Sequence, residues 1–182
     1  RPARRFAGHL GRRVRGREGL FLPQPINTNT VVTIIDSLLT RLGFIDKAKA
    51  SEVAGDWVTK LNVKTPSGEL PVESLSGGNQ QRVVLAKWLA GHPKVLILNG
   101  PTVGVDVGSK AEIHALIRSL AKEGMGILLI SDDIPELMQT CNRILLMRRG
   151  KIVEEFKRED TTEAELDREL VAISHNHEAL RD

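Results

Sequence analysis

A serine and two glycines stand where a helix is predicted to begin, in the run Leu75-Ser76-Gly77-Gly78-Asn79-Gln80-Gln81-Arg82. Paired glycines let the backbone approach a ligand closely. Ser76 and the exposed N–H groups of the first helical turn would present hydrogen-bond donors, and the positive end of the helix dipole, to an anion. Ser-Gly-Gly alone would also fit an ordinary glycine-rich turn that caps a helix. The complete run of eight residues favours a phosphate-binding corner.

A short apolar run further along the chain ends in polar turn residues. Residues 95–98 have the length and β-branched content of a strand buried on both faces, and Asn99, Gly100, Pro101 and Thr102 follow it. Asn99 is uncharged at every pH and is therefore a weak ligand for a hard cation such as Mg²⁺. Gly100 has no side chain and cannot act as a general base. The alternative is a buried strand and turn with no chemistry of its own.

Aspartates precede two further predicted helices. Asp106 lies just before a helix predicted over residues 109–123, where a carboxylate can accept hydrogen bonds from free N–H groups. Asp132 and Asp133 follow a strand predicted at 127–130 and precede a helix predicted at 134–140. A carboxylate at Asp132 would repel a triphosphate, so both aspartates are interpreted as helix caps.

The remaining elements follow from hydrophobic periodicity. Helices are predicted over residues 31–42, 46–61, 80–89 and 162–173, the last with a Thr-x-x-Glu capping pattern, and a third strand at 144–147. Arg149 and Gly150 predict a turn that folds this strand into a hairpin. The chain from 93 onward therefore alternates strand and helix, which is the pattern of a parallel sheet.

Composition places the chain among soluble globular proteins. It has 182 residues, of which 41% are hydrophobic, 27% charged and 3% aromatic, so an aliphatic core is expected. The single cysteine, Cys141, cannot form an internal disulfide, and the histidines lack metal-ligand spacing, so no metal site is predicted. No apolar stretch approaches the roughly 18 residues of a membrane span. Residues 1–24 are rich in arginine and predict a disordered arm.

These motifs resemble those of the ATP-binding-cassette ATPases. Asn79-Gln80-Gln81 within the serine and glycine run resembles in particular the second nucleotide-binding half of ATPases that power bacterial importers of ribose, xylose and galactose. The resemblance covers roughly residues 31–156. It implies that two cassettes face each other head to tail. Each ATP then lies between the phosphate loop of one cassette and the signature motif of the other, which is Leu75-Ser76-Gly77-Gly78 in this chain. This chain would supply the signature side.

The resemblance also implies roles for single residues. Ser76, Gly77, Gly78 and Gln80 would contact the phosphates of an ATP held by a partner cassette, and Mg²⁺ would be bound by that partner. Asp106 would lie at the interface, because residues 103–108 resemble the loop that crosses it.

The same family pattern shows which groups are missing. Asn99 and Gly100 stand where the family has the Mg²⁺-binding Asp and the water-polarising Glu, and Asp132 stands where many cassettes have a histidine. No phosphate loop of the form G-x-x-x-x-G-K-[ST] occurs in the sequence. No catalytic residue is therefore assigned, and this chain alone is not expected to hydrolyse ATP appreciably.

By resemblance the fold is α/β, a partial P-loop NTPase domain of the cassette type. A helical signature subdomain is expected at residues 25–92 and the second half of a parallel-sheet core at 93–156, with the hairpin at its end. A terminal helix is expected at 157–173 and a tail at 174–182. A fragment of this kind would leave core surface exposed unless a partner chain covers it.

The function implied is a partial, degenerate ATP-binding subunit of a sugar importer that couples ATP binding and hydrolysis to uptake. Its partners would be another cassette, membrane subunits and, indirectly, a periplasmic sugar-binding protein. Its location would be cytoplasmic, peripheral on the inner face of the plasma membrane. One alternative is a non-catalytic accessory cassette that lends its signature to an intact ATPase. Another is a soluble nucleic-acid-associated cassette protein using the arginine arm, against which Asn79-Gln80-Gln81 argues.

Overall fold

The computed structural model describes residues 19–175, with side chains described up to residue 172. The chain divides into two compact units, one ending at Leu128 and the other beginning at Leu129. Most of the predicted arm and the end of the predicted tail lie outside the described residues. The division falls within a strand, and the subdomain boundary expected near residue 92 stays a prediction.

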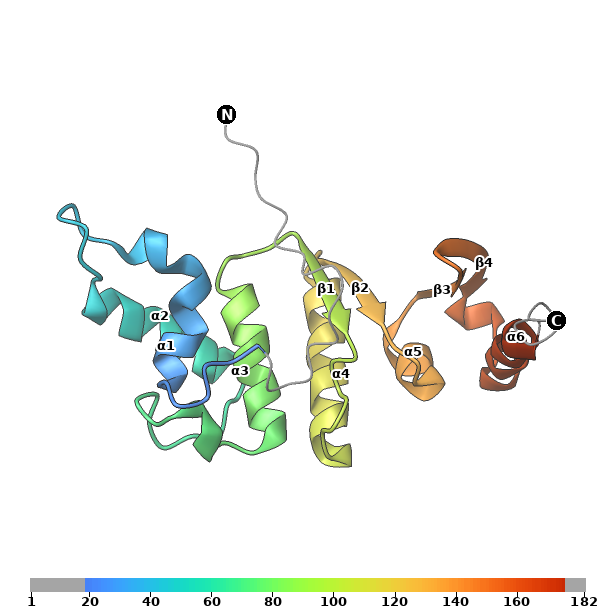
Figure 1. Cartoon of the computed structure of the whole chain (residues 1–182), viewed down its shortest axis with the longest axis horizontal. Helices are drawn as coiled ribbons and strands as arrows, with labels where there is room; N and C mark the ends of the chain where they lie inside the picture. The colour runs from blue at the N-terminus through green and yellow to red at the C-terminus, as the bar shows by residue number, and fades with distance from the viewer. Residues whose placement is uncertain (1–18, 176–182) are drawn as a thin grey trace. The chain divides into compact units, whose positions relative to one another are not determined.

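Helices make up most of the first unit (Figure 1). They are α1 (Ile26–Val31), α2 (Lys47–Lys60), α3 (Gly77–Leu89) and α4 (Val107–Lys122), with short 3-10 helices η1 (Val32–Leu38) and η2 (Val72–Ser74) between them. α1 packs against α2 and α3, and α3 packs against α4. α2, α3 and α4 overlap the predicted helices closely, so those predictions are confirmed.

The first helix differs from its prediction over residues 31–42. It begins at Ile26 and leaves helical geometry at Leu39, whose backbone is extended. Leu39 pairs with Ile45 in a β-bridge, and Gly43 closes the loop between them with a φ of +80°. The apolar periodicity of the sequence therefore extends into a tight loop. In this loop the bridge between Leu39 and Ile45 takes the place of helical hydrogen bonds.

Helix α3 is the central helix of the first unit. Its buried residues include Val83, Val84, Leu85, Ala86 and Leu89, and also the polar residues Gln80, Gln81, Arg82 and Lys87. A second group of buried residues joins α1, η1 and α2 through Val31, Leu38 and Ala54. Because most of α3 is buried, the position of its first turn is fixed by the packing of the helix.

Strands β1 (Val95–Asn99) and β2 (Gly126–Ile130) pair in a two-stranded sheet, and α4 lies between them in the chain. Leu96 and Leu98 are 6% and 7% exposed, whereas Val95 and Ile97 are 52% and 44% exposed. The prediction that both faces are buried is therefore wrong for the described residues. Alternate side chains point to opposite faces, and only one face is covered. The expectation that a partner chain covers exposed core surface remains a prediction.

The second unit contains α5 (Ile134–Thr140), β3 (Arg143–Arg148), β4 (Lys151–Lys157), the 3-10 helix η3 (Arg158–Asp160) and α6 (Glu163–His175). Its core is formed by Ile134, Ile144, Leu146, Phe156 and Leu166. The predicted hairpin and both helices are confirmed.

The third predicted strand is β3, which lies in the second unit and forms the hairpin there. β3 pairs antiparallel with β4, because Arg149 and Gly150 both adopt positive φ and turn the chain directly back. Within the described residues the two sheets are separate and two-stranded.

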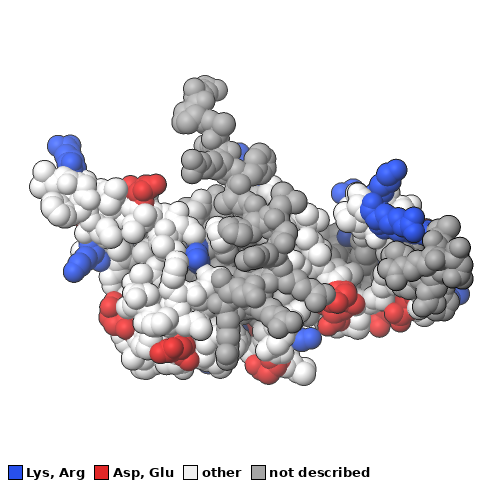
Figure 2. Space-filling model, viewed as in Figure 1, with Lys and Arg blue, Asp and Glu red and all other residues white. Residues whose placement is uncertain are grey.

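The described surface is mixed in charge. Figure 2 shows basic and acidic groups separated by uncharged surface over the helices of the first unit. Among the residues described, no helix combines the length and apolar character that crossing a bilayer would take.

Candidate functional site

Helix α3 begins at an exposed corner. Ser76 is its N-cap residue, with an extended backbone, and its carbonyl accepts the N–H of Gln80 at 2.9 Å. Ser76 and Gly77 are exposed, whereas Gly78 is buried. The N-cap side chain makes no capping hydrogen bond to the first turn. The corner therefore presents a hydroxyl and uncapped backbone N–H groups at the positive end of a 13-residue helix.

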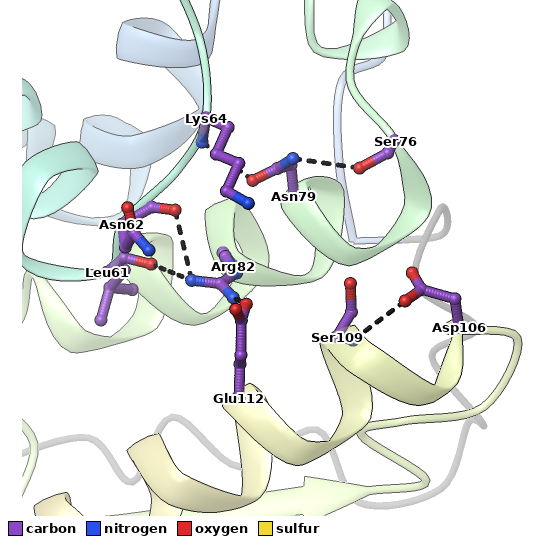
Figure 3. A network of polar contacts seen from close by, with 9 residues as sticks. All are labelled: Leu61, Asn62, Lys64, Ser76, Asn79, Arg82, Asp106, Ser109 and Glu112. Carbon is purple, nitrogen blue, oxygen red and sulfur yellow. Dashed lines mark hydrogen bonds and ion pairs between the residues drawn. The ribbon is translucent and has the colours of Figure 1, made fainter.

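The Ser76 hydroxyl is instead engaged by a side chain one turn along the helix (Figure 3). Asn79 Nδ2 donates to Ser76 Oγ at 3.0 Å, and Asn79 Oδ1 accepts the backbone N–H of Lys64 at 2.9 Å. Asn79 thus connects the serine to the loop that follows α2.

Gln80 points into the protein and not toward the exposed corner. The residue is 5% exposed, and its Nε2 donates to the carbonyls of Leu75 at 3.0 Å and Val72 at 3.3 Å. Both amide hydrogens therefore hold the turn that leads into Ser76. The structure gives Gln80 a supporting position, in contrast to the direct phosphate contact expected from the sequence.

The corner packs tightly against the start of α4. A Cβ atom added to Gly78 would lie 2.4 Å from Ser109 Oγ and 2.7 Å from Ser109 Cβ, so only glycine fits there. A Cβ added to Gly77 would lie 3.7 Å from the carbonyl oxygen of Gly104. The two glycines of the run thus meet the loop and helix that contain Asp106, which brings four predicted site residues into one neighbourhood.

Asp106 caps helix α4, as predicted. Its Oδ1 accepts the N–H of Ser109 at 2.9 Å. This backbone hydrogen bond, and then one with the Ser109 side chain, lower the pKa of the exposed Asp106 carboxyl from its ordinary value. Asp106 is therefore ionised at neutral pH, and its charge faces the positive end of α4. Its expected place at an interface remains a prediction.

Arg82 completes the site and was not singled out from the sequence. Its guanidinium Nη1 donates to the carbonyls of Leu61 at 2.8 Å and Asn62 at 3.2 Å, and its Nη2 forms an ion pair with Glu112 of α4 (Figure 3). The side chain is 9% exposed. One residue thereby joins the end of α2, the middle of α3 and α4. The sequence signal that could have identified it is an arginine directly before the apolar run Val83-Val84-Leu85-Ala86 of the same helix.

The turn after β1 has no carboxylate. Gly100 adopts a φ of +55°, and a Cβ there would lie 2.9 Å from Val103 Cγ2. An L-residue at this position would be strained in both backbone and packing. Asn99 ends the strand and is partly buried. Among the described residues, no three or more His, Cys, Asp or Glu side chains gather as a metal site.

Asp132 lies in the second unit and is exposed. The residue that caps α5 is its neighbour Asp133, whose Oδ1 accepts the N–H of Glu136 at 3.1 Å. The capping prediction is confirmed for Asp133. The structure describes Asp132 in a different unit from the Ser76 corner.

A family model described as "ABC transporter" matches residues 11–103. The chain is 43% identical over 152 residues to a ribose import ATP-binding protein from Rhodococcus jostii, covering 84% of this chain and 30% of that protein. It is 41% identical over 152 residues to a galactose/methyl galactoside import ATP-binding protein from Clostridium perfringens, with the same coverage. The chain thus spans about 30% of the length of the curated relatives it matches.

Solved structures give the fold. A nucleotide-free ATP-binding cassette from an ABC transporter matches with a TM-score of 0.68 at 20% identity, over 80% of this chain and 60% of that one. A dimeric ATP-binding cassette in a post-hydrolysis state, bound to ADP and phosphate, matches with a TM-score of 0.66 at 22% identity and the same coverage. At these identities the likeness concerns the fold alone.

Proposed function

Because the chain belongs to the ABC transporter family, we propose that it is part of the ATP-binding subunit of a sugar importer and that it presents the signature side of an ATP site. Its fold is the α/β cassette type of P-loop NTPase, which confirms the predicted fold class. The names of its relatives, ribose and galactose import ATP-binding proteins, support the sugar class.

The observation that carries the proposal is the exposed, uncapped start of α3. Ser76 and Gly77 are accessible, and no side chain caps the first turn of the helix. A triphosphate oxygen is an anion that can accept from both a hydroxyl and backbone N–H groups. This geometry fits a nucleotide held mainly by another cassette.

The described residues fit a phosphate contact and do not fit a complete hydrolytic site. The γ-phosphate of ATP would be the group that the corner contacts, and Mg²⁺ would be bound by the partner cassette. At the turn after β1, Asn99 offers a neutral amide and Gly100 no side chain. The positive φ of Gly100 and its contact with Val103 show that the turn is shaped around glycine. This chain alone is therefore proposed to bind in trans without appreciable hydrolysis.

The partners follow from this proposal. A second nucleotide-binding cassette would hold the ATP, membrane subunits would receive the resulting motion, and a periplasmic sugar-binding protein would act indirectly. The chain would lie in the cytoplasm against the inner face of the plasma membrane.

The test is nucleotide-dependent association. This chain is mixed with the ribose import ATP-binding protein of Rhodococcus jostii, with Mg²⁺ and a non-hydrolysable ATP analogue, and binding is measured by analytical ultracentrifugation. We expect complex formation that requires the analogue. It should be lost in Ser76→Arg, because the larger arginine side chain would occupy the space of the phosphate.

Ser51→Arg is the matched control, because Ser51 is an exposed serine on α2. The same charge and volume there should leave association unchanged. Equal loss in both variants, or association without nucleotide, would contradict the proposed role of Ser76.

A non-catalytic accessory cassette is the second candidate, and the glycine-shaped turn at Gly100 favours it. It predicts association with a complete ATP-binding protein but no co-purification with importer membrane subunits. Co-purification in detergent would favour the importer subunit instead.

A further inference from the structure

We propose that Asn79 is a positioning residue that sets the direction of the Ser76 hydroxyl, so that the hydroxyl proton faces a bound phosphate. The inference rests on the proposed function of Ser76. It goes beyond that function because it assigns to Asn79 a definite task, which is to fix which hydrogen-bonding groups of Ser76 remain for the nucleotide.

The orientation of the Asn79 amide follows from its other partner. The backbone N–H of Lys64 can only donate, so the Asn79 atom 2.9 Å from it must be the carbonyl oxygen Oδ1. The amide nitrogen Nδ2 then necessarily lies on the opposite branch, where it is 3.0 Å from Ser76 Oγ. The loop after α2 therefore determines which face of the amide meets the serine.

This orientation determines the state of the serine. A hydroxyl has one donor hydrogen and two acceptor lone pairs. Because Asn79 Nδ2 can only donate, Ser76 Oγ accepts from it, and the hydroxyl hydrogen is left to point elsewhere. On an exposed residue that direction is open to an incoming phosphate oxygen, which can only accept.

The same bond keeps the helix terminus open. An N-cap serine commonly turns its oxygen to the N–H groups of the first turn. Ser76 makes no such bond, and its oxygen is held by Asn79 instead. The backbone N–H groups of the first turn therefore remain available together with the hydroxyl proton.

The loop that orients Asn79 is itself held in place. Arg82, one turn further along α3, donates to the carbonyls of Leu61 and Asn62, just before Lys64. Figure 3 shows Asn79 and Arg82 both directed at this loop. The position of the Lys64 N–H relative to α3 is thus fixed by two side chains of the same helix.

A double-mutant cycle tests the inference. The dissociation constant for the Rhodococcus jostii protein, with the ATP analogue and Mg²⁺, is measured for wild type, Ser76→Ala, Asn79→Ala and the double variant. If Asn79 acts through the hydroxyl, Asn79→Ala weakens association about tenfold in the wild-type background and less than about twofold when Ser76 is already alanine. Equal weakening in both backgrounds would overturn the inference.

Asn79→Asp provides a second variant that keeps the acceptor for Lys64. Its carboxylate can only accept, so the Ser76 hydroxyl would donate its hydrogen bond to residue 79. The direction of the bond would then be reversed. We expect weakening at least as great as in Asn79→Ala. Part of that weakening should vanish in the Ser76→Ala background. If Asn79→Asp associates as well as wild type, the inference is wrong.

A measurement on the free chain separates this inference from the proposed function. The side-chain NH₂ resonances of Asn79 in a ¹⁵N spectrum should shift in Ser76→Ala and stay unchanged in Ser51→Ala. Without that shift the Asn79–Ser76 bond is refuted whatever the association result. If wild type does not associate with the partner, the proposed function fails and the inference falls with it. If Ser76→Ala weakens association but Asn79→Ala does not, only the inference fails.

Discussion

Helices α3 and α4 lie against each other and begin in opposite ways. At α4 the Asp106 carboxylate accepts from the Ser109 N–H, so the first turn is closed by its own cap. At α3 the N-cap is Ser76, whose oxygen is held by Asn79 and makes no capping bond. A helix terminus thus stays open to a ligand when the side chain that would close it is engaged elsewhere.

Three other described helices, α2, α5 and α6, begin like α4, whereas α1 follows Pro25 and has no side-chain cap. Asp46 accepts from the Lys49 N–H at 3.1 Å at the start of α2, and Asp133 caps α5 in the same way. Thr162 Oγ1 accepts from the Glu165 N–H at 3.3 Å before α6. The open start of α3 is therefore not a general property of helices in this fold.

The largest effect on the pairing of α3 and α4 is expected from Arg82→Met. The substitution leaves the carbonyls of Leu61 and Asn62 without their donor and removes the ion pair with Glu112. We expect a loss of about 2–4 kcal/mol in the free energy of unfolding, because each buried polar group left unpaired costs about 1–3 kcal/mol. Urea denaturation followed by circular dichroism measures it.

Two further substitutions identify the cause. Arg82→Lys keeps the charge but cannot reproduce the fork, so it should recover less than half of the loss. Glu112→Gln should cost less than about 1 kcal/mol, since the Glu112 side chain is 51% exposed and exposed ion pairs contribute little. A larger cost for Glu112→Gln than for Arg82→Met would show that the ion pair, and not the carbonyl contacts, joins the helices.

An intermediate effect is expected from Gly78→Ala, which would force the two helices apart. Its Cβ would lie 2.4 Å from Ser109 Oγ, and such overpacking costs about 1–3 kcal/mol of unfolding free energy. Gly55→Ala on α2 is the control, because nothing lies within 4 Å of the added Cβ. There alanine should stabilise the protein by about 0.5–1 kcal/mol. If Gly78→Ala also stabilises, the close contact with Ser109 is not present in solution.

The smallest effect concerns the caps themselves. Asp106→Ala should lower the melting temperature because it removes the cap of α4, whereas Ser76→Ala should leave it nearly unchanged because Ser76 caps nothing. Differential scanning calorimetry at pH 7 gives both values. A larger decrease for Ser76→Ala would reverse the comparison between the two helices.

The Asp106 cap also has a pH signature. Hydrogen bonding lowers the pKa of Asp106 in the folded state, so its contribution is present above the unfolded-state pKa of about 3.9. The contribution is lost as the pH falls through the lower folded-state pKa. The stability difference between wild type and Asp106→Asn should therefore shrink as the pH is lowered from 5 toward 2. A constant difference over that range would exclude the ionised cap.

The motifs could be predicted from the sequence because each depends on residues that are close together in the chain. The serine and glycine run, the aspartate caps at Asp106 and Asp133, and the hairpin at Gly150 each depend on residues a few positions apart. Arg82 and Gln80 were not readable in the same way. The role of Arg82 depends on the position of the Leu61 carbonyl, which is distant in sequence. The role of Gln80 depends on its side chain being buried against the Leu75 carbonyl.

The sequence by itself predicted a phosphate-binding corner at Ser76, and it determined that the turn at Asn99 and Gly100 lacks carboxylates. Residue type and short-range order are enough for both. Only the tertiary structure decided which groups of that corner are free. Lys64, brought beside Asn79 by the packing of α2 on α3, orients the amide, and the contact with Ser109 makes Gly78 a steric requirement. Hydrogen bonds and close contacts act over a few ångströms, so they depend on which segments the fold brings together.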